Sequence, residues 1–198
     1  HAPRLVDNFL QLYRSHRTAL EKIMRQGSER ASDKLMESSP EAIIHDFFRN
    51  NSNHFPPLEN AAEELRRAEP CDAYDVYAVL KARLKSRHGI GIETCPIEEM
   101  SDALRVYDEG ARKLRLSEAL DHTNRVFQLA HVLCLIEFPD LLDGLTENSG
   151  ILSQVGLARC HVELANYFAA AYLMPYERFL AAAEVAKYDV DRIAAAFG

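Results

Sequence analysis

The chain has 198 residues, of which 47% are hydrophobic and 27% charged, so it holds enough apolar side chains for one well-formed core and is not a disordered segment. Its formal net charge of −7 argues against nucleic-acid binding by this segment, because a protein that grips the phosphate backbone needs a basic face. We therefore expect any DNA contact to lie outside it. The longest apolar run, from Val126 to Ile136, falls short of the roughly 20 residues that span a bilayer, so we expect no membrane span, and no signal peptide at His1.

A long amphipathic helix is predicted over residues 3–25, where apolar side chains recur mostly at spacings of three and four. Its polar side carries a basic strip that includes Arg14 and Arg17, which could receive phosphates or simply face solvent. A second helix is expected from Pro40, a first-turn proline, through Phe48.

The polar loop between the second and third predicted helices is unusual in composition. Asn53, His54 and Phe55 offer hydrogen-bond donors, a titratable ring and an aromatic face immediately before two prolines. The loop is either a plain turn between helices or one wall of a pocket. The third helix is predicted over residues 58–67, and residues 1–70 are interpreted as an N-terminal helical segment.

The chain then changes from helix to strand. A fourth helix is predicted over residues 73–87, with basic residues at its C-terminal end that complement the helix dipole. Residues 90–95 are short, β-branched and alternating, which predicts a first strand. A hairpin is expected from strands at 104–107 and 113–116, with Gly110 at the position of positive φ. We therefore expect a small antiparallel sheet.

Residues 125–137 predict a helix that is buried on every side, because apolar side chains cover all of its faces. Asp121 is expected to cap the N-terminus of this central helix, and Pro139 to end it. Apart from Gln128, only His131 interrupts the apolar run. A polar side chain in such a place is the first candidate for function.

Four further helices are predicted after the central one. They comprise a short helix near Leu141 that closes at Gly144, and longer ones over residues 156–174, 175–186 and 190–197. Runs of alanine in the two middle helices favour close packing. The elements together indicate a mainly α fold (α+β), a helical bundle with a small antiparallel sheet.

The four cysteines are widely spaced, and no Cys-x-x-Cys pair occurs. We interpret them as buried free thiols in a reducing cytoplasm; a disulfide or a metal cluster is the alternative. They are Cys71, Cys95, Cys134 and Cys160.

The stretch Phe-Gln-Leu-Ala-His that ends at His131 resembles the zinc helix of ImmA/IrrE-type metallopeptidases, where that histidine opens the motif His-Glu-x-x-His. Val132 replaces the general base and Leu135 the second zinc ligand. One imidazole cannot hold zinc in a site that needs three protein ligands. The run 164–175 is similar to the signature that follows the zinc helix. The resemblance implies an ImmA/IrrE metallopeptidase-like fold reused for binding, with residues 71–198 as a degenerate, ligand-sensing domain.

Four stretches together resemble the short-chain fatty acyl-responsive transcription factors of bacteria, which include regulators of propionate and acetate catabolism. They are residues 53–56, 83–89, 127–131 and 165–176. The resemblance implies a three-part cytoplasmic regulator with an N-terminal helix-turn-helix, this sensor segment and a Cys-containing C-terminal domain. It also implies that the segment binds a short-chain acyl-CoA, propionyl-CoA or acetyl-CoA, without a metal and without enzyme activity. We expect DNA contact only through another domain, and a homo-oligomer such as a dimer.

An acyl-CoA needs an apolar slot with a hydrogen bond for the thioester. The fold implied by the resemblance sets two helices face to face at the former metal site, so we expect His131, Tyr167, Phe168 and Tyr172 to form the slot. Asn166, a residue of poor helix propensity, would orient His131 or bond a neighbouring loop. The alternative for His131 is a core histidine bonded to a backbone or side-chain acceptor.

The phosphates of an acyl-CoA need cations. Arg125 at the start of the central helix and Arg112 and Arg115 on the hairpin are the expected ones, with Arg14 and Arg17 behind them. Each could equally be a surface charge.

Two other functions remain open. A zinc peptidase would use His131, His161 and Glu163 as ligands and would retain about one zinc per chain. A structural or dimerisation module would have a filled core and no response to any acyl-CoA.

Overall fold

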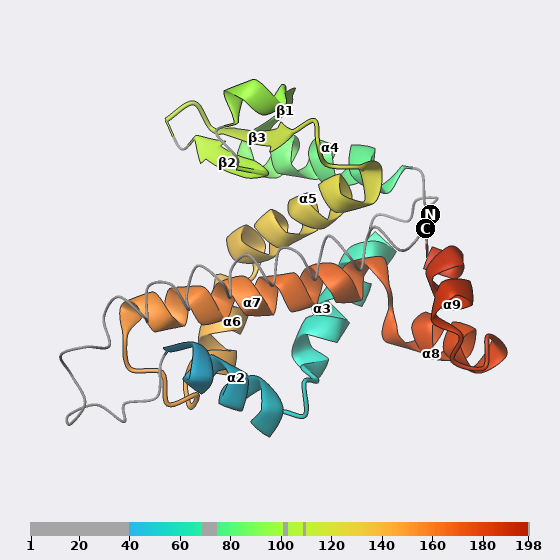
Figure 1. Ribbon diagram of the computed structural model, residues 1–198. Helices are drawn as coiled ribbons and strands as arrows, with labels where there is room; N and C mark the ends of the chain where they lie inside the picture. The colour runs from blue at the N-terminus through green and yellow to red at the C-terminus, as the bar shows by residue number, and fades with distance from the viewer. Residues whose placement is uncertain (1–39, 69–74, 101–102, 109, 198) are drawn as a thin grey trace, which may run out of the picture.

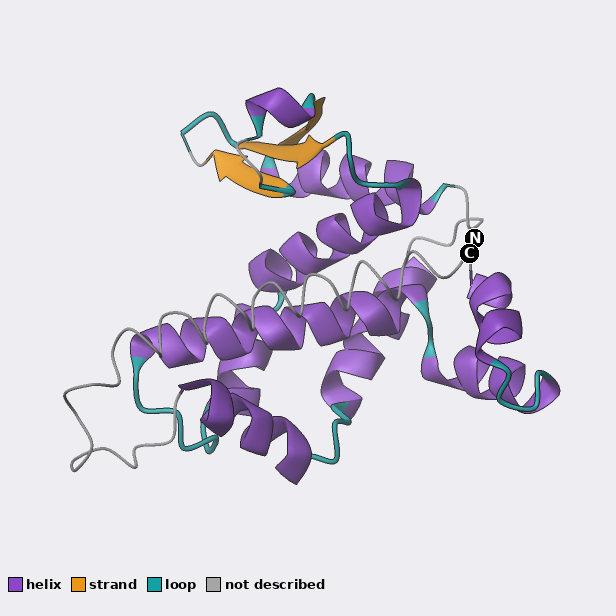
Figure 2. Cartoon of the chain, in the orientation of Figure 1, coloured by secondary structure: helices purple, strands orange, loops and turns teal. Residues whose placement is uncertain are grey.

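The computed structural model describes residues 40–68, 75–100, 103–108 and 110–197. The predicted helix at 3–25, with Arg14 and Arg17, lies outside these ranges, as does Cys71. Helices make up most of the described chain, and the strands form one small sheet (Figure 2). The elements in order are α2 (Pro40–Asn50), α3 (Pro56–Ala68), α4 (Val76–His88), β1 (Gly91–Cys95), the 3₁₀ helix η1 (Ile97–Glu99), β2 (Arg105–Asp108), β3 (Lys113–Ser117), α5 (His122–Glu137), α6 (Pro139–Thr146), α7 (Gln154–Leu173), α8 (Tyr176–Val185) and α9 (Val190–Phe197).

The architecture is layered around two central helices, α5 and α7, which pack against each other (Figure 1). α4 and the sheet lie on the far side of α5, whereas α2, α3 and α6 pack against α7 on its other side. α8 and α9 form a helical pair at one end, joined by contacts such as that between Phe179 and Phe197. The predicted mainly α fold with a small sheet is confirmed.

The central helix α5 forms where its apolar run predicts. The Asp121 carboxylate accepts a hydrogen bond of 2.8 Å from the backbone N–H of Asn124, so the predicted N-cap is present. Leu129, Leu133 and Cys134 have no exposed surface. The helix ends before Pro139, as expected, and that proline opens α6, which continues through Gly144 to Thr146.

The sheet is mixed, which corrects the prediction of an antiparallel one. β2 and β3 form the expected antiparallel hairpin, with Arg105 opposite Leu116. β1 pairs in parallel with β3, and the strand order is β1-β3-β2. The connection through η1 carries the chain past β3, so that β1 and β2 occupy opposite edges.

The hairpin turn also differs in detail from the prediction. Arg112, with φ of 48°, takes the positive-φ position in place of Gly110. The Asp108 carboxylate accepts from the backbone N–H of Ala111 at 2.8 Å. This side-chain hydrogen bond stabilises the turn.

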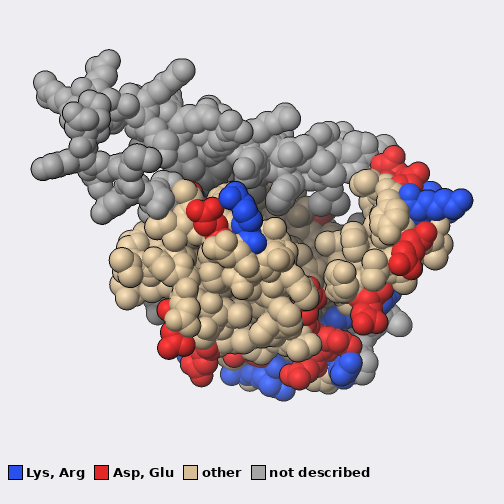
Figure 3. Space-filling view, turned by 90° about the horizontal axis from the view of Figure 1, so that it is seen from below, with Lys and Arg blue, Asp and Glu red and all other residues tan. Residues whose placement is uncertain are grey.

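Two further predictions concern cysteines and the membrane. Cys95, Cys134 and Cys160 are buried free thiols, as predicted. Within the described ranges no helix is both long and apolar enough to cross a bilayer. On the face seen in Figure 3, Lys and Arg side chains are interspersed with Asp and Glu around an uncharged centre and form no single basic patch.

Candidate functional site

His131 lies in the interior of α5 with 2% of its surface exposed, and it is held by a residue from the sheet. Nη1 of Arg105, the first residue of β2, is 2.7 Å from its Nδ1. A guanidinium can only donate, so Nδ1 accepts and carries no proton. The backbone of Val162 on α7 makes a second hydrogen bond to the ring, which leaves the imidazole proton on Nε2. His131 therefore joins β2, α5 and α7.

The imidazole of His131 is neutral. Burial is the largest cause that lowers its pKa, and the charge of Arg105 lowers it further. The hydrogen bond to Val162 opposes both effects, and the resulting pKa is about 4. Burial also lowers the pKa of Arg105, although a guanidinium stays charged at any physiological pH.

The residues of the zinc-peptidase alternative do not converge. The Nε2 atom of His161 lies 3.1 Å from the Thr146 hydroxyl, on the α6 side of α7. Glu163 is exposed and accepts from the Asn166 amide at 3.3 Å, which is the interaction that Asn166 makes in place of one with His131. Among the residues that the structure describes, no group of three or more His, Cys, Asp or Glu could hold a metal ion.

Of the aromatic residues predicted for the slot, Phe168 and Tyr172 stack on each other with ring centroids 6.5 Å apart, whereas Tyr167 contacts other neighbours. The hydroxyl of Tyr167 donates to Glu59 on α3 at 2.6 Å. Burial, followed by this carboxylate, raises the pKa of Tyr167 to about 12. Phe168 is fully buried, with its ring centroid 5.3 Å from that of Phe138. The remaining aromatic, Tyr172, lies under the guanidinium of Arg66, which also donates to its backbone carbonyl.

The three cations predicted for the phosphates occupy separate surroundings. Arg125 donates to the Glu118 carbonyl at 3.1 Å, and its buried Nε has no hydrogen-bond partner within the described ranges. Arg112 donates to the His88 carbonyl. Arg115 lies on the opposite face of the sheet from His131. It donates to the Sγ of Cys95 at 3.1 Å and to Glu99 at 2.8 Å.

Two features were missed by the sequence analysis. Arg105 could have been suspected, because strand alternation puts it on the same face as the core residue Leu116. The second is a buried ion-pair cluster of Arg83, His88 and Glu137, in which Glu137 accepts from both side chains of α4. The only sequence signal for it was an acid at the end of an otherwise apolar helix.

The loop before α3 is a turn anchored by Phe55. That ring is 1% exposed and packs against Phe47, Phe48 and Tyr167. The side chain of His54 is exposed. Phe55 is therefore a core residue that belongs to this aromatic cluster.

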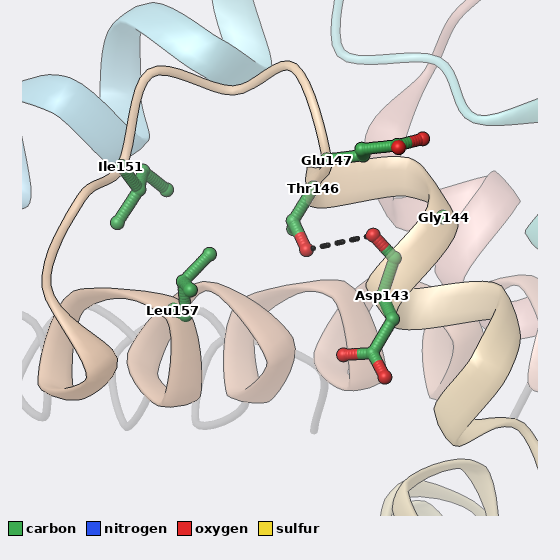
Figure 4. A pocket seen from close by; sticks show the side chains of 6 residues that line it. All are labelled: Asp143, Gly144, Thr146, Glu147, Ile151 and Leu157. Carbon is green, nitrogen blue, oxygen red and sulfur yellow. Dashed lines mark hydrogen bonds between the residues drawn. The ribbon is translucent and has the colours of Figure 1, made fainter.

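An open hollow of about 410 Å³ lies between α6 and the first turns of α7 (Figure 4). Ile151 and Leu157 face each other across it, whereas the carboxylate of Glu147 points away. The hydroxyl of Thr146 hydrogen-bonds to backbone carbonyls of α6, including that of Asp143. None of the predicted site residues lines this hollow.

Residues 85–198 match the model of the Peptidase_M78 family, described as the IrrE N-terminal-like domain. The chain belongs to this family. Within the IrrE N-terminal-like family it departs from the peptidase motif at Val132 and Leu135, and it holds its one motif histidine against an arginine.

Its relatives include transcriptional regulators. The chain is 31% identical over 98% of its length to the HTH-type transcriptional regulator RamB of Mycobacterium tuberculosis, and 28% identical over 99% to PrpR of the same species. It is 29% identical over its full length to the propionyl-CoA carboxylase regulator of Cereibacter sphaeroides. In each case the chain spans 41% of the relative's length.

A solved structure of a Mycobacterium tuberculosis transcriptional regulator superimposes on the chain with a TM-score of 0.72 at 31% identity. The match covers 80% of this chain and 48% of that one. Both resemblances predicted from the sequence, to the ImmA/IrrE fold and to bacterial regulators, are confirmed.

Proposed function

We propose that this chain is the effector-binding segment of a cytoplasmic transcriptional regulator of short-chain fatty acid metabolism. Its effector is a short-chain acyl-CoA, propionyl-CoA or acetyl-CoA, and it has no enzyme activity. Ligand binding changes the behaviour of a DNA-binding domain elsewhere in the protein. The names of the relatives, one of them a regulator of propionyl-CoA carboxylase, support this proposal.

The observation that carries the proposal is the buried contact between Arg105 and His131. A zinc peptidase keeps its motif histidine free to bind the metal and follows it with a general base. Here a guanidinium occupies Nδ1 at 2.7 Å, and its positive charge disfavours a divalent cation beside it. Val132 cannot activate water. The arrangement retains a buried polar group in the helix without hydrolytic chemistry, which suits binding.

Regulation follows if the effector has different affinities for two conformations of the segment. Because α5 contacts both the α4 layer and α7, a ligand near His131 would bias how these layers pack. DNA-binding regulators commonly read two-fold symmetric sites as dimers, so the whole protein is proposed to act as a homo-oligomer.

A thermal-shift experiment tests the proposal. The chain is heated with propionyl-CoA, acetyl-CoA, free CoA and Zn²⁺ in parallel. A ligand at about 100 times its dissociation constant adds roughly 2.7 kcal/mol, which for a domain of this size shifts Tm by about 5 to 10 °C. We expect a larger shift with an acyl-CoA than with free CoA.

Two results would contradict this expectation. Equal Tm values with and without every CoA species would favour the structural or dimerisation module. Stabilisation by Zn²⁺, with about one zinc per chain retained through dialysis, would favour the peptidase.

A further inference from the structure

Arg105, Arg66 and Arg125 are partly buried arginines for which the described ranges show no carboxylate partner, but Arg66 and Arg125 each donate to a backbone carbonyl, whereas Arg105 meets an imidazole. Other arginines near the core are paired with acids. Arg83 has Glu137, Arg115 has Glu99 and Arg159 has Glu41. Within the described ranges, Arg105 hydrogen-bonds only to the neutral ring of His131. A guanidinium has five N–H donors, so most of its hydrogen-bonding capacity is unused. A partly buried cation without a counter-charge is costly unless a ligand supplies one.

His131 orients this cation without neutralising it. Its Nδ1 accepts from Nη1, and its other side is tied to the backbone of Val162. The ring is thereby fixed between α5 and α7, and it holds one corner of the guanidinium. The N–H groups of the guanidinium that do not contact His131 stay available for a ligand, and the contact with His131 fixes the direction in which they point. Such an edge matches the paired oxygens of a phosphate or a carboxylate.

Arg105 is only partly buried. It lies on β2, which is an edge strand of the sheet. Tyr107 projects from the same face of β2, two residues along, and 45% of its surface is exposed. An exposed aromatic ring beside a partly buried cation suits a ligand that joins an anionic group to a larger organic body.

We propose that Arg105, positioned by His131, binds an anionic oxygen group of the effector, with Tyr107 at the mouth of the site. The group is a phosphate of a CoA thioester or the carboxylate of a free short-chain acid. This inference rests on the proposed function and assigns the anion to Arg105, in place of Arg125, Arg112 and Arg115.

The test is isothermal titration of the chain with propionyl-CoA, free CoA, propionyl-pantetheine and propionate. Propionyl-pantetheine carries the thioester without the nucleotide phosphates, and propionate carries only the carboxylate. The variant Arg105→Met keeps the length of the side chain and removes its charge. Arg49→Met is the matched control, because Arg49 is an exposed arginine of α2 paired with Asp46.

If the group bound by Arg105 is a phosphate, Arg105→Met should weaken the binding of propionyl-CoA and CoA by about 10- to 100-fold and leave the binding of propionyl-pantetheine unchanged. For a carboxylate, the same loss should appear with propionate alone. The Arg49→Met control should match the wild type throughout. Binding of every anionic ligand by Arg105→Met within twofold of the wild type would overturn the assignment.

The failures of the two proposals are distinguishable. If propionyl-CoA binds the wild type and Arg105→Met equally and propionate binds neither, the acyl-CoA function stands and the Arg105 site is wrong. If the wild type binds propionate through Arg105 but no CoA species, the site stands and the acyl-CoA function is wrong. If the wild type binds none of the four ligands, both are wrong.

The positioning role of His131 has its own readout. His131→Asn retains an acceptor close to the position of Nδ1, whereas His131→Leu removes it. We expect the asparagine variant to recover most of the anion affinity that the leucine variant loses. Equal affinities in the two variants, with melting curves that show both folded, would contradict the positioning role.

Discussion

The central helix α5 carries two buried polar clusters that are built in opposite ways. Near its C-terminal end, Glu137 accepts from Nε and Nη2 of Arg83 at 2.8 and 2.7 Å and lies 2.8 Å from Nε2 of His88. Arg83 is 8% and Glu137 11% exposed. In the middle of the helix, Arg105 meets a neutral imidazole. One cluster is charge-balanced and the other is not.

The difference separates a structural role from a binding role. Burial would raise the pKa of Glu137, but the hydrogen bonds and charges of Arg83 and His88 outweigh it and lower that pKa. Glu137 is therefore ionised and paired with Arg83, and this ion pair joins α4 to α5. At His131, burial and the charge of Arg105 both lower the pKa of the imidazole. No carboxylate of the described chain pairs with Arg105. The first cluster is complete without a ligand, whereas the second gains from one.

The largest expected effect is on the balanced cluster. Glu137→Gln should lower the free energy of unfolding by about 3 to 5 kcal/mol, because it removes the carboxylate that accepts two hydrogen bonds from the buried Arg83. Urea unfolding measures the loss. Glu99→Gln is the control, since Glu99 is an exposed partner of Arg115 and should cost less than about 1 kcal/mol. Similar costs in the two variants would show that the Glu137 cluster has no special role.

The unbalanced cluster should show itself in the dependence of stability on pH. The pKa of His131 is about 4 in the folded chain, below the ordinary histidine value of 6.5, so the unfolded chain binds the proton more readily. The stability that the neutral His131 contributes to the folded chain is present above pH 6.5 and is lost as the pH falls toward 4. The wild type should lose roughly 2 to 3 kcal/mol more than His131→Asn between pH 7.5 and pH 4.5.

Urea unfolding at the two pH values measures this difference. Glu137, with its lowered pKa, contributes stability that is lost only at lower pH, as the pH falls through its folded-state pKa. The two clusters therefore respond in separate pH windows. Parallel curves for the wild type and His131→Asn would mean that His131 is not held neutral by the fold.

The smallest effect is expected from Arg105→Met in the absence of ligand. Removing a cation that lacks a counter-charge also removes the cost of burying it, so the free energy of unfolding should change by less than about 1 kcal/mol. Arg83→Met should cost several times more, because it leaves Glu137 underpaired. Thermal and urea unfolding of both variants give the comparison. A large loss in Arg105→Met would make Arg105 a structural residue.

The sequence predicted most of the helices, the hairpin and the family, since these depend on local patterns. A helix with apolar side chains on every face has to be buried, and α5 is. Asp121 caps that helix because the capping geometry involves only residues within one turn. The loss of the metal motif at Val132 and Leu135 was also visible, because it depends on spacing along one helix.

The neighbour of each buried face could be decided only by the tertiary structure. Strand alternation could have suggested that Arg105 shares a face with Leu116, but nothing local placed His131, 26 positions away, opposite it. The same limit applies to Tyr167, which was expected beside His131 and hydrogen-bonds to Glu59 on α3. It applies as well to β1, whose alternation cannot specify a parallel partner. Periods of 2 and 3.6 residues encode which side of an element is apolar, whereas the packing of the whole chain selects what that side meets.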